Sequence, residues 1–473
     1  MKALRLLSLA GLFVCLSLGF SAAVCGAEDP NSAKPPDQTS KEEKDSAYRL
    51  KWNVDTLVGD YEKHGRRNPK WDASAKSALL IFAQVRTYSG KPEVTNGLAK
   101  LGPAVNAALT DGCKDPLILY LAARFATPEG KLSWKERGEQ YRIAAEGLCH
   151  GEYAAIRKFY GALRAAEALN PGENHTPQDV HYWRREASRY LNEAVKDTAM
   201  PPSEVYEACD QLLTQVKKNE GQLAAFYEAL DPILFKNWPS ESSFFLLRGQ
   251  FYREYAWQAR GSTYANEVTQ SGWTLFAERL SEAEKALTKA WELNPKNARI
   301  AWEMMGVELG QGKGRSRMEL WFKRAADLNP NYYDAFHAKL YYLEPKWYGS
   351  PKDMLEFGRE CVNSKKWGGQ VPLILKDAHE ALIKYEPAKD KAGYWKRPEV
   401  WKDINAAFEK FFALNPQENG WRHSYALFAC KAEQWDVLSR QIPLLGEVNY
   451  EFFGGKDAYN EMVRRAKEGA AKK

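Results

Sequence analysis

The stretch NARIAWEMMGVELGQGKGRSRMELWFKRAADLNP, Asn297 to Pro330, contains two apolar-patterned segments on either side of a glycine-rich turn. Apolar residues recur in both segments at the three- and four-residue spacing of a helix. The second segment closes with Leu-Asn-Pro, and proline cannot continue a helix. The stretch therefore predicts two helices joined by a short turn, and the same pattern can be followed outward along the chain.

Leu-Asn-Pro endings recur at Pro171, Pro295, Pro330 and Pro416. Pro295 and Pro330 lie 35 residues apart, within the range of about 20–50 residues that is typical of repeat architectures. Helical apolar spacing continues through most of the chain, whereas the alternation typical of strands is scarce. We therefore expect an all-α fold of repeated helical hairpins, with long insertions between some of the helices.

The residue pattern of this hairpin resembles tetratricopeptide (TPR) repeats, which have a period of about 34 residues. Trp302 and Gly306 match the tryptophan and glycine of the first TPR helix, and the second-helix positions are matched by Phe322, Ala325 and Pro330. The resemblance implies a right-handed α-α superhelix. In it, Gly306 and Ala325 would let paired helices approach closely, and Trp302 and Phe322 would fill the space between them.

A longer segment, from Ser243 to His379, is similar to an uncharacterised bacterial domain-of-unknown-function family of TPR-like proteins. The similarity rests on YAWQARGSTYANEVTQSGWTLFAERL, VELGQGKG and NPNYYDAFHAKLYYLEPKWYGS. It implies no biochemical activity. The best repeats are expected within residues 243–363.

Four regions are predicted along the chain. Residues 1–27 have the basic start, apolar run and small-residue end of a secretory signal peptide, with cleavage near Ala27. Residues 28–45 are rich in Pro, Ser, Lys and acids, which predicts a disordered linker. A helical region is expected over 46–150, either divergent repeats or a separate domain, followed by a TPR-like repeat domain over 151–473.

The signal peptide predicts a bacterial protein of the periplasm or one that is secreted. A retained signal anchor is the alternative, but no later apolar run approaches the roughly 18 residues needed to span a membrane. A lipid anchor at Cys25 is disfavoured because Val24 and Ala22 do not fit a lipoprotein signal. No transmembrane segment is expected after cleavage.

Charge and metal-ligand patterns exclude several classes of function. The 67 basic and 61 acidic residues are nearly balanced and intermixed along predicted helices, which argues against a nucleic-acid partner. The seven histidines include no H-E-x-x-H motif, and no Cys-x-x-Cys pair occurs, so no metal site is predicted. Five cysteines follow the signal peptide, and buried free thiols are favoured over a Cys113–Cys149 bridge.

Catalytic motifs are missing as well. GQGKGRS lacks the spacing of a phosphate-binding loop and is interpreted as a turn, and no nucleophile motif is present. We therefore predict no cofactor and no enzymatic activity. An α-helical enzyme of the α/α-barrel hydrolase type, using two acids across a cleft, or a glycan-binding protein of the cell envelope is the alternative. A purely architectural component is a third possibility.

The favoured interpretation is a protein-interaction or scaffolding module with a protein or peptide partner. Its groove should be lined by first helices of the hairpins, with Ile300, Glu303 and Val307 on the exposed face.

The stretch from Ala256 to Trp273 is expected to contain two helix ends joined by a polar, aromatic loop, from about Arg260 to Trp273, as an insertion within one repeat. Binding candidates in this loop are Arg260, Tyr264, Asn266, Glu267 and Trp273, because aromatic and arginine side chains are enriched at binding hot spots. The alternative is that the loop only braces the repeat, with Tyr264 and Trp273 in the core. The chain's 16 tryptophans are expected to lie mostly in the core.

Overall fold

The computed structural model describes residues 41–88, 92–125, 132–169, 175–217 and 220–470. Every secondary-structure element that spans several of these residues is a helix. This confirms the all-α prediction. The chain divides into two compact units between Gln215 and Val216. The boundary expected at residues 150/151 falls inside the first unit, where helices α6 and α7 pack against each other.

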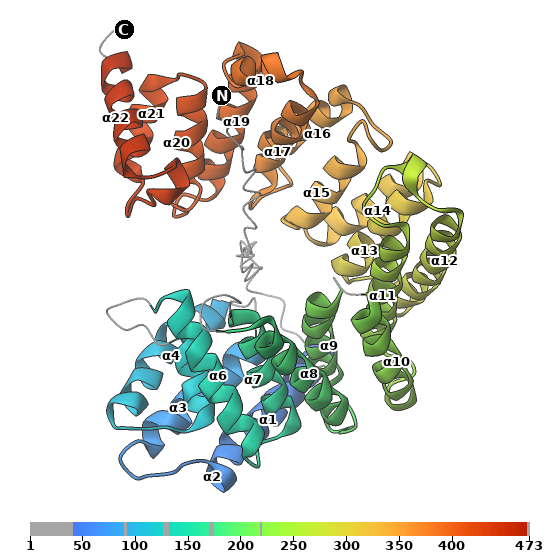
Figure 1. The fold of residues 1–473 in the computed structure, drawn as a ribbon, viewed down its shortest axis with the longest axis vertical. Helices are drawn as coiled ribbons and strands as arrows, with labels where there is room; N and C mark the ends of the chain where they lie inside the picture. The colour runs from blue at the N-terminus through green and yellow to red at the C-terminus, as the bar shows by residue number, and fades with distance from the viewer. Residues whose placement is uncertain (1–40, 89–91, 126–131, 170–174, 218–219, 471–473) are drawn as a thin grey trace, which may run out of the picture. The chain divides into compact units, whose positions relative to one another are not determined.

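The first unit contains nine helices among its described residues (Figure 1), with α2 following α1 through a π-helical turn. They are α1 (Lys41–Val54), α2 (Asp60–His64), α3 (Asp72–Thr87), α4 (Pro92–Thr110), α5 (Pro116–Phe125), α6 (Trp134–His150), α7 (Ala155–Ala168), α8 (Pro177–Ala194) and α9 (Pro202–Val216). Lys41–Asp45, expected in the linker, instead begin α1. The rest of that linker and the expected signal peptide lie outside the described residues.

The second unit contains helices α10 to α22 among its described residues. They are α10 (Glu220–Asn237), α11 (Ser242–Arg260), α12 (Gln270–Leu293), α13 (Ala298–Gln311), α14 (Arg315–Leu328), α15 (Tyr333–Tyr342), α16 (Pro351–Asn363), α17 (Ile374–Leu382), α18 (Ala388–Tyr394), α19 (Pro398–Leu414), α20 (Arg422–Lys431), α21 (Trp435–Gln441) and α22 (Lys456–Ala470).

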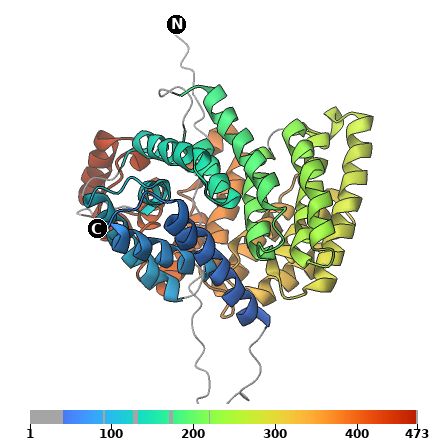
Figure 2. The same cartoon turned by 90° about the horizontal axis from the view of Figure 1, so that it is seen from below.

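Helices pack mainly against their neighbours in the chain, as expected for stacked hairpins. In the second unit, α11 packs along α12, and α13 along α14 (Figures 1 and 2). The first helices of successive hairpins also touch, since α13 contacts both α11 and α15. These three helices therefore present one continuous face.

Leu-Asn-Pro ends three helices in the same way. The backbone N–H groups of Asn294, Asn329 and Asn415 each donate a hydrogen bond of 2.9 Å to a carbonyl four residues earlier, and each asparagine itself has left the helical conformation. The following proline cannot continue the helix, so the chain turns towards the next one. In the fourth motif, Asn170 and Pro171 lie outside the described residues.

The insertion before Trp273 consists of two helix ends joined by a loop, as predicted, but the loop is shorter than expected. Ala256 to Arg260 form the last turn of α11, and Gln270 to Trp273 form the first turn of α12. Only residues 261–269 connect the two helices, with a short 3-10 turn at Ala265–Glu267. The additional residues therefore mainly lengthen the two helices.

The glycine-rich segment forms the predicted turn between α13 and α14. Gly312 ends α13 with φ of 60°, a left-handed conformation that favours glycine. Lys313 pairs with Glu284 at 2.6 Å, and Arg317 pairs with both Glu284 and Glu308. The cations of this turn are thus neutralised within the chain, which is consistent with a structural turn.

Candidate binding groove

A groove of about 320 Å³ lies on the face shared by α11, α13 and α15 in the second unit. Its lining includes three large aromatic rings, a glycine floor and one arginine with two acids. The lining residues are Arg253, Glu254, Trp257, Trp302, Glu303, Met305, Gly306, Leu309, Ala338 and Tyr341. The groove is thus built by the first helices of three successive hairpins, as the repeat pattern predicted.

Helical spacing explains how each helix supplies its part of the groove. On α13, Trp302, Met305 or Gly306, and Leu309 follow one another at intervals of three or four residues, which places them on one face. Gly306 has a particular role at the floor. A Cβ atom there would meet Cδ of Arg253 at 2.8 Å, so the glycine leaves the space in which Arg253 lies.

The polar groups of the groove are paired with one another. Nε of Arg253 lies 2.8 Å from a carboxylate oxygen of Glu303, although at an angle outside that of a hydrogen bond, and its Nη2 donates to Glu254 at 2.9 Å. Gln250 donates to the other Glu303 oxygen at 3.0 Å. Burial disfavours the charged guanidinium, but Glu303 and Glu254 more than offset this and raise the pKa of Arg253. Arg253 therefore remains a cation inside a neutralised cluster.

Aromatic rings extend from the groove towards the end of α11. The Trp257 ring centroid lies 4.9 Å from that of Phe276 and 5.9 Å from that of Trp347, and the Trp347 centroid lies 5.9 Å from that of Tyr341. Trp257, Trp347 and Tyr341 thus form a connected aromatic wall. Sequence reasoning placed the tryptophans mostly in the core. The signal that could have found Trp257 is its position one helical turn before Arg260.

The structure brings two of the insertion's candidates together and separates three. The Arg260 guanidinium lies 5.4 Å from the ring centroid of Trp273, which packs on Phe276. Tyr264 is 81% exposed, and Asn266 and Glu267 are exposed in the same connection. The alternative in which Tyr264 enters the core as a brace is therefore wrong for this residue. A binding role for these residues stays a prediction.

The positions predicted for two groove residues are wrong. Ile300 and Val307 were expected on the exposed face, but both are fully buried. With Met304 they form the opposite stripe of α13, directed into the helix-packing core. Glu303 does line the groove, but it is only 2% exposed, so its expected exposure is also wrong.

Some of the TPR-like positions lie in the core between helices, and Trp302 lies in the groove. Phe322 and Ala325 are buried on α14, and the Phe322 centroid lies 5.1 Å from that of Phe336 in the following hairpin. Trp302 does not share that space. It is half-buried in the groove, 6.0 Å from Tyr332 between ring centroids. Pro330 follows the asparagine that ends α14, as predicted.

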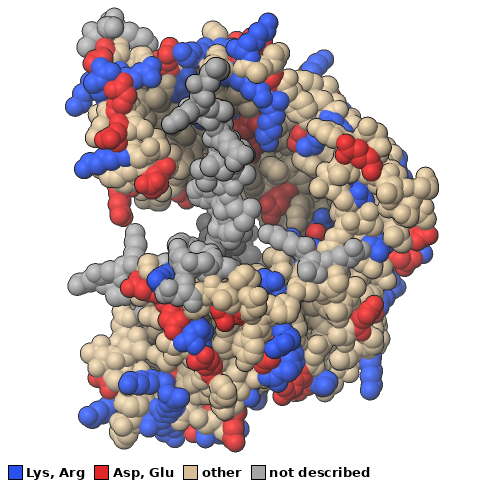
Figure 3. All heavy atoms as spheres, in the orientation of Figure 1, with Lys and Arg blue, Asp and Glu red and all other residues tan. Residues whose placement is uncertain are grey.

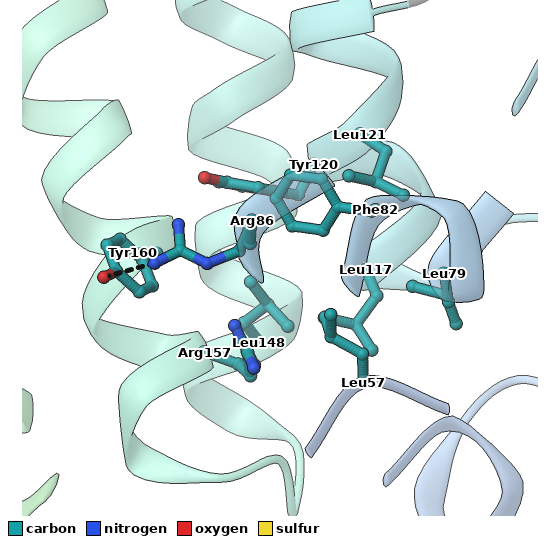
Figure 4. Close-up of a pocket in the computed structure, with 10 residues that line it drawn as sticks. All are labelled: Leu57, Leu79, Phe82, Arg86, Leu117, Tyr120, Leu121, Leu148, Arg157 and Tyr160. Atoms are coloured by element: carbon teal, nitrogen blue, oxygen red, sulfur yellow. Dashed lines mark hydrogen bonds between the residues drawn. The ribbon is translucent and has the colours of Figure 1, made fainter. Parts of the chain in front are cut away.

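A second cavity lies within the first unit (Figure 4), lined by apolar residues together with Arg86, Arg157 and Tyr160. Arg86 donates to the Tyr160 hydroxyl at 2.8 Å and to Glu204 at 2.7 Å. The cavity volume is about 10 Å³, roughly the space of one water molecule. It is therefore a packing feature of a polar core and too small for a ligand.

Other candidate chemistry is sparse among the described residues. They contain no group of three or more His, Cys, Asp or Glu side chains able to hold a metal ion, and the five described cysteines are free thiols. On the face drawn in Figure 3, basic and acidic side chains are interspersed, without a broad patch of one sign. None of the helices in the described part of the chain has the length and apolarity required to cross a membrane.

Comparisons with known proteins add little to this description. No protein-family model matches the chain, so the resemblance of residues 243–379 to an uncharacterised family remains a hypothesis, and no curated protein matches. Among solved structures, the chain is similar to the human IFIT1 dimer with PPP-AAAA, at 14% identity over 90% of this chain and 91% of that chain. The TM-score is 0.29, and a similarity of that extent carries no argument about ligand or site.

Proposed function

We propose that this protein is a peptide- or protein-binding module and that the groove on α11, α13 and α15 is its binding site. The observation that carries the proposal is the set of three rings, Trp257, Trp302 and Tyr341, brought to one groove by three successive hairpins. Aromatic side chains supply large contact area and dominate binding energy at interfaces.

The size and construction of the groove support this role. Its volume of about 320 Å³ lies at the lower end of the roughly 300–1,000 Å³ that is typical of ligand pockets. Trp257 and Tyr341 are each packed against Trp347, so their rings are held in place before a partner arrives. A groove with fixed walls loses little conformational entropy on binding.

The hydrolase alternative is less well supported by the groove's acids. Glycoside hydrolysis requires two carboxyl groups that can reach the scissile bond. Glu303 is 2% exposed and paired with Arg253 and Gln250, and Glu254 is paired with the same arginine. This arrangement favours binding over acid–base catalysis. Release of reducing sugar from envelope glycans, lost on Glu254→Gln, would support the enzyme instead.

We also propose that the protein acts after export, on the basis of the signal-like residues 1–27. Mass spectrometry of the mature protein from its native host should find a new N-terminus near Glu28. Retention of residues 1–27 on a cytoplasmic protein would contradict export without affecting the groove.

The binding proposal is tested with a random-peptide library displayed on phage and selected on the whole protein. Trp302→Ala removes one groove wall, and Trp291→Ala is the matched control. Trp291 is also half-buried, but it packs edge-to-face against Trp321 and is not part of the groove. We expect sequences that bind the wild-type and Trp291→Ala proteins and are lost with Trp302→Ala. Equal recovery on all three folded proteins would contradict the proposal.

A further inference from the structure

Arg260 continues the groove-facing stripe of α11 by one helical turn. Arg253 and Glu254, then Trp257, line the groove at helical spacing, and Arg260 follows three residues later. Its guanidinium carbon lies 5.6 Å from the Trp257 ring centroid and 6.0 Å from that of Trp347. Arg260 is therefore adjacent to the aromatic wall of the groove.

The charge of Arg260 is not neutralised by any described residue, unlike that of Arg253. Two carboxylates pair with Arg253, whereas Arg260 makes only backbone hydrogen bonds. Its Nη1 donates to the carbonyl oxygens of Gly261 at 3.1 Å and Thr263 at 3.2 Å. Its remaining N–H groups have no partner in the part of the chain that the structure describes.

The side chain is nevertheless held in place. It is half-buried among Trp257, Trp273 and Trp347, and cation–π contact with tryptophan is favourable for a guanidinium. The two carbonyls fix one nitrogen of its planar fork. A fixed guanidinium with open donors is suited to bidentate pairing with a carboxylate.

We propose that Arg260 recognises an aspartate or glutamate side chain in a peptide whose neighbouring apolar or aromatic side chain occupies the groove. This inference rests on the proposed function and names the chemistry of its partner. Charge complementarity selects an acid, because Arg253, the arginine inside the groove, is already neutralised. The rings of Trp257 and Tyr341 select an apolar neighbour.

The test uses the phage-displayed library together with Arg260→Gln and Arg260→Glu. Arg324→Gln is the matched control, since Arg324 is half-buried against Trp291 and Trp321, has no carboxylate partner among the described residues and lies outside the groove. We expect wild type and Arg324→Gln to select peptides with Asp or Glu at a constant distance from an aromatic residue. Arg260→Glu should select Lys or Arg at that position.

A selected peptide, synthesised with an amidated C-terminus, is then used to measure how much its acidic side chain contributes to affinity. Replacing its acid by the amide should weaken binding to wild type about ten- to a hundredfold, and binding to Arg260→Gln should hardly change. Binding that depends on Trp302 but shows no acid preference, or the same acid preference on Arg260→Gln, would overturn the role of Arg260 alone. Binding that requires a free C-terminal carboxylate in place of the acidic side chain would overturn the proposed role of Arg260 as well. Failure to select any Trp302-dependent peptide would remove both the proposed function and this inference.

Discussion

The polar core of the first unit and the groove of the second contain the same kinds of side chain, but the first is closely packed and the second is open. In the first unit, Glu204 is fully buried between Arg49 and Arg86, next to a cavity of about 10 Å³. In the second, Arg253 and two glutamates lie beside a groove of about 320 Å³. Arginine, glutamate and aromatic rings therefore do not by themselves indicate a binding site. Open space beside them is the distinguishing feature.

Removing Glu204 should have the largest effect. Glu204→Ala leaves Arg49 and Arg86 without their fully buried partner, and loss of one member of such a pair costs about 3–5 kcal/mol of unfolding free energy. Glu207→Ala is the control. Glu207 pairs with the same arginines but is 35% exposed, so it should cost about 1 kcal/mol or less. Urea unfolding, with hydrogen exchange of α1, α3 and α9 as the local readout, would measure both. Equal losses of unfolding free energy in the two variants would refute the claim that the buried pair contributes more than the exposed one.

Acid should weaken the same core to a smaller extent, because a protonated Glu204 still fills its place and its carbonyl oxygen still accepts hydrogen bonds. Burial alone would raise the pKa of Glu204, but Arg86 and Arg49 hold it well below its usual value. The ionic contribution is complete above the unfolded-state pKa of about 4.3 and is lost as pH falls through the lower folded-state value. Wild type should therefore lose more stability than Glu204→Gln as the pH is lowered below about 4. Parallel pH profiles would contradict this.

In the second unit, Trp302→Ala should affect binding more than folding. A tryptophan at the centre of an interface contributes about 2 kcal/mol or more, so affinity for a selected peptide should fall at least about 30-fold. Gln311→Ala, on the same helix but not lining the groove, should leave affinity unchanged. Calorimetric titration measures both. A Trp302→Ala protein that is unfolded in thermal melts would point instead to a core role.

The smallest effect is expected at the tip of the long hairpin. Tyr264 is 81% exposed and contacts no ring among the described residues, so Tyr264→Ala should change stability by no more than about 0.5 kcal/mol. Peptide affinity should also stay the same, in contrast to Arg260→Gln. A loss of affinity with Tyr264→Ala would extend the binding surface from the groove to the tip.

Local sequence signals predicted the helices well and the faces of those helices less well. Leu-Asn-Pro located the ends of α12, α14 and α19, because proline and the asparagine cap act within a few residues. Helix α13 is contacted by helices on several sides, so apolar residues surround most of it. Periodicity therefore did not separate Ile300 and Val307 from Trp302 and Leu309. Pairwise contacts between hairpins, which the sequence does not display, decide that choice.

The central claim is that peptides bind in the groove, and site-specific photocrosslinking tests it most directly. A photoreactive amino acid at Ala338, which lines the groove, is compared with one at Leu320, which is 48% exposed on α14 outside the groove. The account predicts that a selected peptide crosslinks from position 338, that excess unlabelled peptide competes, and that position 320 gives only background. Equal crosslinking from both positions, or crosslinking from 320 alone, would contradict it.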